Sequence, residues 1–546
     1  MAAVVGYRKR RGVELFMLVL AIGIAFSGYA LIHLNRDAKL PDAWPWALGA
    51  LSVIGLVLHL VIRWRTPYAD PLILPLVLLL NGTGLAMIHR LDLGTNPVMH
   101  SAELQLLWTS IGAAVCCAVL ILLQDYQVLR RYPYLLFLAG LILLLLPLLP
   151  GIGEEKNGAR IWIHLGPYSF QPAELAKIIL VIAFASYLVD RREVLALGGA
   201  KFLGLDLPRA RDLGPILVMW LVSLAVLVFQ KDLGTSLLFF GLFVMMIYVA
   251  TERPSWAILG VVLFLVGAYG AYLTFGHVQS RVSAWLDPFS NYDRNYQVIQ
   301  AQFGIAWGGI FGTGWGQGRP NLTPLAKSDF ISAALGEEIG ITGLLAIIAI
   351  YGLLVARGLR AALGARDPFG KLLAAGLAFV FSLQVFAIIG GVTRLLPLTG
   401  LTTPYLSQGG SSLVANWLLA ALLLVITHQI RRPVPEAPAQ PMVSLAADTT
   451  QVILLDRAAS TPRPAPPAGT DDELAAASAG VSAGVSTGGA SAAPGTDDEL
   501  TASFEAGQQT ATAPSPDEVT RAVPALPEQQ RPDDLTAPVP RIEEES

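Results

Sequence analysis

Residues 141–150 read LILLLLPLLP and residues 237–250 read LLFFGLFVMMIYVA, and segments of this kind decide the fold. Each is continuously apolar, as expected for a helix that crosses lipid, whereas the strands of a membrane β-barrel alternate in polarity over about 10 residues. Most of the segments approach the length of about 20 residues at which a helix spans the hydrocarbon of a bilayer. Twelve of them can be marked before residue 432, at approximately 14–34, 45–63, 71–89, 105–123, 134–150, 171–189, 213–229, 233–250, 254–275, 331–356, 370–393 and 410–430. The sequence therefore predicts an all-α, polytopic membrane protein with about 12 transmembrane helices.

The chain combines an apolar, basic body with an acidic tail. Of its 546 residues, 54% are hydrophobic and 14% are charged. Soluble domains carry about 25% charged residues, so a soluble globular enzyme is excluded as a description of the whole. Residues 433–546 hold 18 acidic and 5 basic side chains, and residues 1–432 hold 22 acidic and 32 basic ones. The tail is rich in Ala, Pro, Ser, Thr and Gly and cannot bury enough apolar surface to fold, so we expect a disordered C-terminal tail over 433–546.

The distribution of Lys and Arg between loops predicts the orientation, because cytoplasmic loops are enriched in both. If the N-terminus is inside, the inner segments carry 20 of these residues and the outer segments carry 11, four of them in one long loop. The first apolar run follows the basic residues 8–11 and lacks a small-residue cleavage site, so we interpret it as a retained helix. We expect a multi-pass plasma-membrane protein with both termini in the cytoplasm.

Two outer loops are too long to be simple connections. They cover about 151–170 and 276–329, and functional residues on the outer face should lie in them or at the adjacent helix ends. The second loop contains a run of glycines between 304 and 318. Because the strand–loop–helix context of a dinucleotide site is missing, we reject nucleotide binding and expect a re-entrant or surface-lying segment that closes over a membrane cavity.

Ionisable residues in or next to membrane helices cost free energy, so each of them indicates a structural or functional role. Glu174 and Lys177 are three residues apart, so they share a helix face and can pair. The pair has two possible roles. In the structural one, Glu174 is a carboxylate that stabilises the start of its helix, and Lys177 pairs with it. In the functional one, both side chains form a charged lining at the outer mouth of a cavity. Arg160 and Trp162, in the first long loop, could present a cation and an aromatic ring to a phosphate and a sugar.

For several further carboxylates, both a structural and a functional role are open. Asp232 begins an apolar segment at an outer turn, where an ordinary helix cap is expected. Asp329 ends the second long loop, and a helix N-cap is again the structural alternative. Glu337 follows eight residues later, near the face of Asp329, and Glu338 points further round.

A Gly- and Pro-rich stretch, residues 393–412, precedes the last apolar segment and contains a further polar cluster. Such backbone is tolerated at membrane depth only where it lines protein or a cavity. Its polar members include Arg394, Ser407 and Ser411. The sequence shows no Ser–His–Asp set, no His/Cys cluster with metal-ligand spacing and no basic stripe for nucleic acid. A metal site is therefore not predicted.

Six ordered blocks carry a resemblance to a known family. They are GARIWIHLG, SFQPAELAKI, DLGTSLL, YQVIQAQFGIAWGGIFGTGWGQG, SDFISAALGEEIG and LLPLTGLTTPYLSQGGSS, within about residues 70–432. Together they resemble the SEDS family, which includes RodA, FtsW and SpoVE, and most of all its actinobacterial RodA subgroup. The resemblance implies a ten-helix glycosyltransferase core over 70–432, preceded by a basic segment and two extra helices over 1–69. Lys231, Ser328 and Gln408 depart from common family residues without removing a charged group that has an assigned role.

The resemblance implies a peptidoglycan glycosyltransferase that polymerises lipid II on the outer face of the plasma membrane during elongation. Undecaprenyl pyrophosphate would leave, and a class B penicillin-binding protein, a transpeptidase, would be the partner, with membrane lipids around both and no nucleic acid involved. Asp329 matches the essential aspartate of the family and is our candidate general base. We expect a substrate-binding role for Arg160, Glu174, Lys177, Asp232, Glu337, Ser407 and Ser411. The resemblance implies no definite cofactor, and a divalent cation is left open.

Three rival functions remain at this point. Twelve apolar segments with buried charges also suit a transporter, for example a lipid II flippase, although the halves show no repeat and the charges gather at the outer ends. A division polymerase of the FtsW type shares the same motifs. A non-catalytic scaffold for cell-wall enzymes would use the acidic tail as its docking element.

Overall fold

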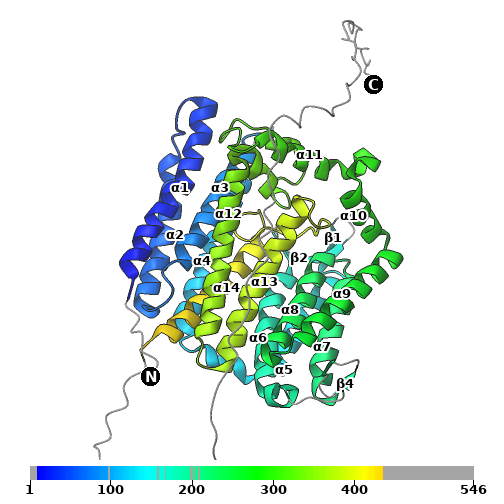
Figure 1. Cartoon of the computed structure of the whole chain (residues 1–546). Coiled ribbons are helices and arrows are strands. Elements are labelled where there is room, and N and C mark those ends of the chain that lie inside the picture. The colour runs from blue at the N-terminus through cyan, green and yellow to red at the C-terminus, as the bar shows by residue number, and fades with distance from the viewer. Residues whose placement is uncertain are drawn as a thin grey trace, which may run out of the picture. The chain divides into compact units, whose positions relative to one another are not determined.

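Helices make up most of the structure (Figure 1). The computed structural model describes residues 9–95, 99–156, 159–166, 168–196, 201–202, 205–206 and 210–433, so nearly all of the expected disordered tail lies outside the described residues. The α-helices are α1 (Arg11–Asp37), α2 (Trp44–Arg65), α3 (Ile73–Asp92), α4 (Ser101–Leu122), α5 (Pro133–Leu145), α6 (Pro172–Ala196), α7 (Ala210–Phe229), α8 (Leu233–Thr251), α9 (Pro254–Thr274), α10 (Gly276–Leu286), α11 (Tyr292–Gly308), α12 (Ile331–Gly364), α13 (Pro368–Val392) and α14 (Gly410–Arg431). Short 3-10 helices are η1 (Tyr126–Arg131), η2 (Leu146–Leu148), η3 (Pro288–Asn291) and η4 (Pro320–Leu322).

The expected multi-pass membrane architecture is confirmed. Within the described residues, ten helices are long and apolar enough to cross a membrane. Two shorter apolar helices, Pro133–Leu148 and Leu217–Phe229, coincide with the expected segments 134–150 and 213–229. The sequence therefore located the apolar helices. The helix α5 has 13 residues, whereas α7 as a whole has 20, the length of a membrane crossing.

A central group of helices is covered by peripheral ones. In the most apolar stretches of α6 and α14, 83% of the residues are buried, whereas the share is 6% in α9 and 28% in α1 and α2. The helix α14 packs against α4, and α13 packs against α6, α8 and α12. The apolar surfaces of α1, α2 and α9 are therefore available to lipid, which is the environment that their sequences favour.

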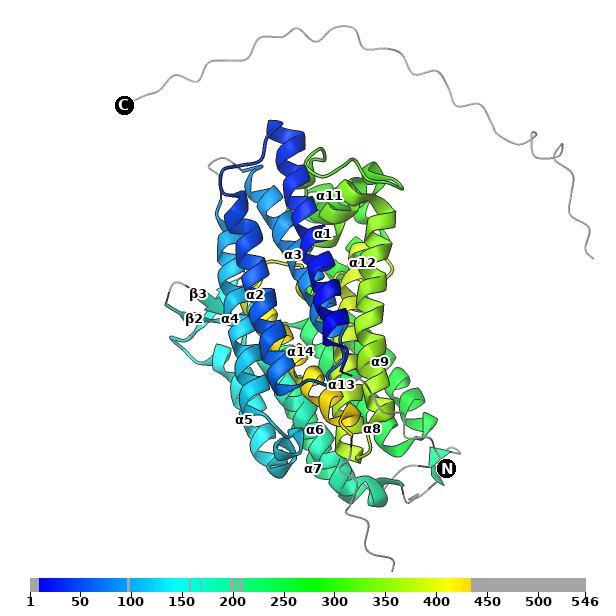
Figure 2. The same cartoon turned by 90° about the vertical axis from the view of Figure 1, so that its left-hand side faces the viewer.

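The bundle has two ends, which we name by the residues that meet there. At the basic end, Arg431 at the end of α14 pairs with Asp70, which precedes α3. At the loop end, Arg36 near the end of α1 donates to the carbonyl oxygen of Leu93, which follows α3, at 2.7 Å. Figure 2 shows α1, α2 and α3 side by side along the bundle.

The first long loop contains a small sheet that the all-α prediction did not include. Strands β1 (Gly153–Lys156), β2 (Ala159–Leu165) and β3 (Tyr168–Phe170) form an antiparallel sheet in that order. A second pair, β4 (Lys201–Phe202) and β5 (Leu205–Asp206), lies between α6 and α7. The alternation in ARIWIHL suits a strand with two different faces, and Gly166 adopts φ +63° in the turn before β3.

The second long loop, 276–329, folds largely as α10 and α11, followed by the glycine loop, which we define as residues 308–318. The glycine loop packs against α12 where this helix breaks at Gly340, which has φ +70°. A Cβ atom on Gly340 would lie 2.3 Å from the backbone nitrogen of Gly312. Glycine is required there for both the conformation and the close approach.

Candidate active site

A cavity of about 410 Å³ lies between α10, α11, the turn before α12 and the segment that follows α13. Among the candidate site residues from the sequence, Asp329 lines this cavity. Its other polar lining side chains are Ser280, Arg281, Trp285, Arg294, Asn295, Gln297 and Arg394. Three arginines and one carboxylate give the lining an excess of positive charge, which favours an anionic ligand.

Asp329 lies in a tight turn, Leu325–Phe330, directly before α12. Leu325 has φ +56°, and its carbonyl oxygen accepts the N–H groups of Ser328 at 3.0 Å and Phe330 at 3.2 Å. The N-cap position of α12 is occupied by Phe330 and has no side-chain cap. The alternative in which Asp329 caps the helix is therefore wrong, and its carboxylate is not used to begin α12.

The electrostatic surroundings of Asp329 suit a proton acceptor. Burial raises the pKa of Asp329 to about 6, and the hydroxyl group of Ser328 and the guanidinium of Arg281 oppose this shift. Within the described part of the chain, no ion pair of 4.0 Å or less involves Asp329. A carboxylate with a pKa just below neutral pH is mostly ionised there and can accept a proton from a reacting hydroxyl.

Arg281 is held beside Asp329 by the backbone of the segment after α13. Its Nη1 donates to the carbonyl oxygens of Leu398 at 3.0 Å and Thr399 at 2.9 Å. A Cβ atom on Gly400 would lie 3.5 Å from Arg281 Nη2 and 4.0 Å from Asp329 Oδ2, so both groups border the same space. Because a guanidinium has five N–H donors, Arg281 retains donors for a ligand in this space.

The other two arginines come from different elements. Arg394 is half-buried, and its Nη2 donates to the carbonyl oxygen of Trp285 in α10 at 2.9 Å. Arg294 is exposed on α11. The three guanidiniums can bind a ligand with several negative oxygens, such as a diphosphate, next to the carboxylate of Asp329.

Glu174 and Lys177 form the pair that their spacing predicts, at 2.5 Å, and both are buried in α6. Lys177 Nζ also donates to Gln384 Oε1 at 2.7 Å, and Gln384 Nε2 donates to the carbonyl oxygen of Thr402 at 3.0 Å. The pair does not line the cavity around Asp329. Its contacts instead connect α6 to α13 and to the segment that carries Gly400.

Asp232 and Glu337 both accept backbone N–H groups. Asp232 Oδ1 accepts the N–H of Thr235 at 2.9 Å, so it caps α8 as expected. Glu337 Oε1 accepts the N–H of Arg319 at 2.5 Å, and this contact holds the end of the glycine loop. Asp232 also contributes to the field at the cavity, because its carboxylate acts on Arg281.

The three remaining candidates lie in different parts of the structure. Arg160 is half-buried in β2 and does not line the cavity. Ser407 is buried, and its Oγ donates to the carbonyl oxygen of Ser328 at 2.5 Å, one residue before Asp329. Ser411 is buried in the first turn of α14. In the described residues, no group of three or more His, Cys, Asp or Glu side chains could hold a metal ion.

The sequence analysis did not single out Arg281 and Arg294. Both belong to the long loop 276–329, which carries four of the 11 basic residues that the expected orientation places outside the membrane. Outer loops of membrane proteins are usually poor in Lys and Arg. This local excess was therefore a signal for an anion site, and it could have been used.

Comparisons with known proteins agree with the sequence motifs. The profile of one protein family, described as "Cell cycle protein" and comprising FtsW, RodA and SpoVE, matches residues 71–432. The chain is 48% identical to the peptidoglycan glycosyltransferase RodA of Mycobacterium tuberculosis over 447 residues, which cover 81% of this chain and 95% of that protein. It is 47% identical to the protein of the same name from Mycobacterium leprae, with 81% and 96% covered.

A solved structure also resembles the fold. It is described as "Structural coordination of polymerization and crosslinking by a peptidoglycan synthase complex" and matches with a TM-score of 0.54 and 29% identity. The match covers 67% of this chain and 99% of the solved one. The chain therefore belongs to the family of membrane proteins that comprises FtsW, RodA and SpoVE.

Proposed function

We propose that this protein is a peptidoglycan glycosyltransferase and that the cavity around Asp329 is its active site. The RodA proteins at 47% and 48% identity carry this activity in their names, and the match covers nearly their whole length. One observation carries the site: the carboxylate of Asp329, without an ion pair among the described residues, shares a cavity with three arginines.

The proposed reaction transfers a glycosyl group from a lipid diphosphate to a sugar hydroxyl. The 4-hydroxyl oxygen of the acceptor sugar forms a bond to C1 of the donor, and the bond between C1 and the diphosphate oxygen breaks. Asp329 takes the hydroxyl proton, because a neutral hydroxyl is a weak nucleophile. The diphosphate leaves with the bonding electrons, and Arg281, Arg294 and Arg394 stabilise its negative charge.

The substrate that fits this chemistry is lipid II, and the leaving group is undecaprenyl pyrophosphate. The lipid chain can remain against the membrane-spanning helices while the diphosphate and sugars reach the cavity. The excess of Lys and Arg at the basic end supports cytoplasmic termini and a cavity on the outer face of the plasma membrane. Likeness to RodA proteins favours a role in elongation over division.

The proposed partner is a class B penicillin-binding protein. Support comes from the solved peptidoglycan synthase complex, whose description joins polymerisation with crosslinking. A glycan strand polymerised here would need a transpeptidase to crosslink its peptides. The experiment below therefore includes a class B penicillin-binding protein as an added component.

Polymerisation of lipid II by the purified full chain, with and without a class B penicillin-binding protein, tests the proposal. We expect glycan strands from the parent protein and a rate loss of roughly 10²–10⁴ for Asp329→Asn, because this change removes the proton acceptor and keeps its size. Asp190→Asn is the matched control, since Asp190 is an exposed partner of Arg130 away from the cavity. Absence of glycan strands under both conditions would refute the activity, and near-parent rates for Asp329→Asn would refute the site.

A further inference from the structure

We infer that the ion pair between Asp92 and Lys327 positions Asp329 for catalysis, an inference that rests on the proposed function. Lys327 lies two residues before Asp329 in the same turn. Its Nζ is 2.5 Å from Asp92 Oδ1, and the two side chains are 17% and 3% exposed. A pair this well shielded from water holds its geometry better than a surface pair does.

Asp92 gives the pair a rigid base at the joint between α3 and α4. Its Oδ2 accepts the N–H of Ala102 in the first turn of α4 at 2.8 Å. His100, at the N-cap position of α4, provides no side-chain cap, so Asp92 satisfies this end of the helix from outside. Lys327 Nζ is also 3.2 Å from Ser101 Oγ at the start of α4.

The same face of α4 holds the second segment that contacts the turn. Gln105, one helical turn beyond Ser101, donates from Nε2 to the carbonyl oxygen of Ser407 at 2.9 Å. Gln105 Oε1 accepts the N–H of Gly409 at 3.2 Å. Ser407 in turn holds the backbone of Ser328. The outer end of α4 is therefore a common platform for the turn and for the segment that borders the cavity.

The turn needs these contacts because its backbone is strained. Leu325 adopts a left-handed conformation, which is costly for a residue other than glycine, and such strain persists only where the surroundings fix it. Lys327 is fixed twice, by its side chain and by its carbonyl oxygen, which accepts the N–H of Gln408 at 2.8 Å. Release of the side chain would let Asp329 move, and a misplacement of about 1 Å can cost about 10²-fold in rate.

A direct contact between Lys327 and the substrate is the competing role. The Nζ of Lys327 already contacts Asp92, Ser101 and Met99, the last at 3.4 Å from Sδ. Lys327 is also absent from the lining of the cavity. A substrate-binding lysine would change KM, whereas a positioning lysine changes kcat, so the two roles are separable.

Steady-state kinetics of lipid II polymerisation by the full chain test the inference. We expect Lys327→Met to lower kcat by roughly 10- to 100-fold with KM changed by less than about threefold. Lys327→Arg should recover most of the rate, because it restores the charge. The matched control is Lys371→Met, which removes a pair with Glu252 of 3.1 Å at the opposite end of α13 and should leave kcat unchanged.

The double variant with Asp329→Asn decides whether the pair acts through Asp329. If it does, Lys327→Met should cause no further loss in the Asp329→Asn background, because coupled residues are not additive. An equal loss in both backgrounds, or a rise in KM alone, would overturn the inference. If Lys327→Met does not fold, Asp92→Asn serves instead, since it keeps an acceptor for Ala102. An inactive parent protein would refute the proposed function, whereas an active parent with an unaffected Lys327→Met would refute this inference alone.

Discussion

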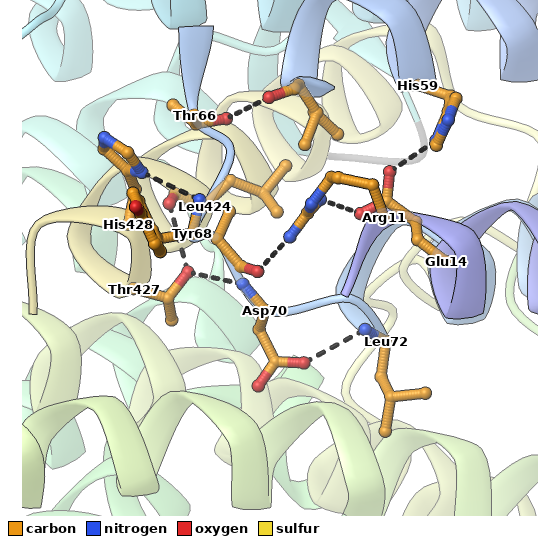
Figure 3. A network of polar contacts seen from close by, with 12 residues as sticks. Arg11, Glu14, His59, Thr66, Tyr68, Asp70, Leu72, Leu424, Thr427 and His428 are labelled. Carbon is orange, nitrogen blue, oxygen red and sulfur yellow. Dashed lines mark hydrogen bonds and ion pairs between the residues drawn. The ribbon is translucent and has the colours of Figure 1, made fainter. Parts of the chain in front are cut away.

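Asp70 and Asp329 show two uses of the same side chain in two regions of one bundle. At the basic end, Asp70 is fully buried, and its Oδ1 accepts the N–H of Leu72 at 3.0 Å (Figure 3). Its Oδ2 pairs with Arg431 and lies 3.6 Å from Nη1 of Arg357. Asp329, at the cavity, is half-buried and has no ion-pair partner within the described part of the chain.

Next to Asp70, a second buried carboxylate is also paired with basic side chains. Figure 3 shows Arg11 between Glu14 and the backbone before Asp70, with His59 on the other side of Glu14. His59 Nδ1 is 2.8 Å from Glu14 Oε1. At the basic end arginines bind carboxylates, whereas at the cavity Arg281 and Arg394 bind backbone carbonyls. The carboxylates at the basic end are therefore paired, whereas that of Asp329 has no ion pair among the described residues.

Removal of the structural carboxylate should have the largest effect on stability. Asp70→Ala removes the buried carboxylate that pairs with Arg431 and Arg357, and we expect the free energy of unfolding to fall by about 3–5 kcal/mol. Denaturant unfolding in detergent measures this loss. The rate of polymerisation per folded molecule should stay near that of the parent, and a loss of rate without a loss of stability would show that Asp70 is not merely structural.

Removal of a cavity arginine should affect the reaction more than the fold. Arg281→Gln keeps donors for the carbonyl oxygens of Leu398 and Thr399 but removes the charge, so we expect kcat/KM to fall by roughly 10- to 100-fold. Arg366→Gln, in a polar cleft at the basic end, is the matched control. Equal rates for the two variants would remove Arg281 from the proposed diphosphate site.

A change of pH should alter the rate of polymerisation less than the substitutions described above. Only the ionised form of Asp329 accepts a proton, so kcat/KM should rise with pH to a plateau, with a midpoint near the pKa of about 6. The stability of the fold should change with pH in the opposite direction to kcat/KM. Because the pKa is raised from its ordinary value of 3.8, the folded state binds more protons between these values, and the contribution of Asp329 to stability falls as pH rises through that window. A flat rate profile between about pH 5 and pH 8 would contradict the assignment.

Local patterns predicted what short-range physics determines. Continuous apolar runs located the helices, and the spacing of Glu174 and Lys177 predicted their contact on α6. The position of Asp232 before an apolar segment predicted the cap of α8. Each of these features depends on residues within one or two helical turns.

Features that depend on distant segments could not be derived in this way. Arg281, Arg294 and Arg394 meet only because α10, α11 and the segment after α13 surround one cavity. The N-cap interpretation of Asp329 failed because the turn that begins at Leu325 places Phe330, not Asp329, at the N-cap of α12. Motif resemblance selected Asp329 as the candidate general base, and the structure places it at the cavity, whereas helix-capping rules alone would have made it a helix cap.

The most direct test of the contrast between the two aspartates is made on Asp329→Asn at about pH 7, with turnover of lipid II and Tm measured on the same preparation. We expect turnover to fall by roughly 10²–10⁴, because the proton acceptor is gone. We expect Tm to stay the same or rise, since the variant no longer buries an ionised carboxylate whose pKa is raised. A lower Tm with turnover near that of the parent would contradict this expectation and would make Asp329 a structural residue like Asp70.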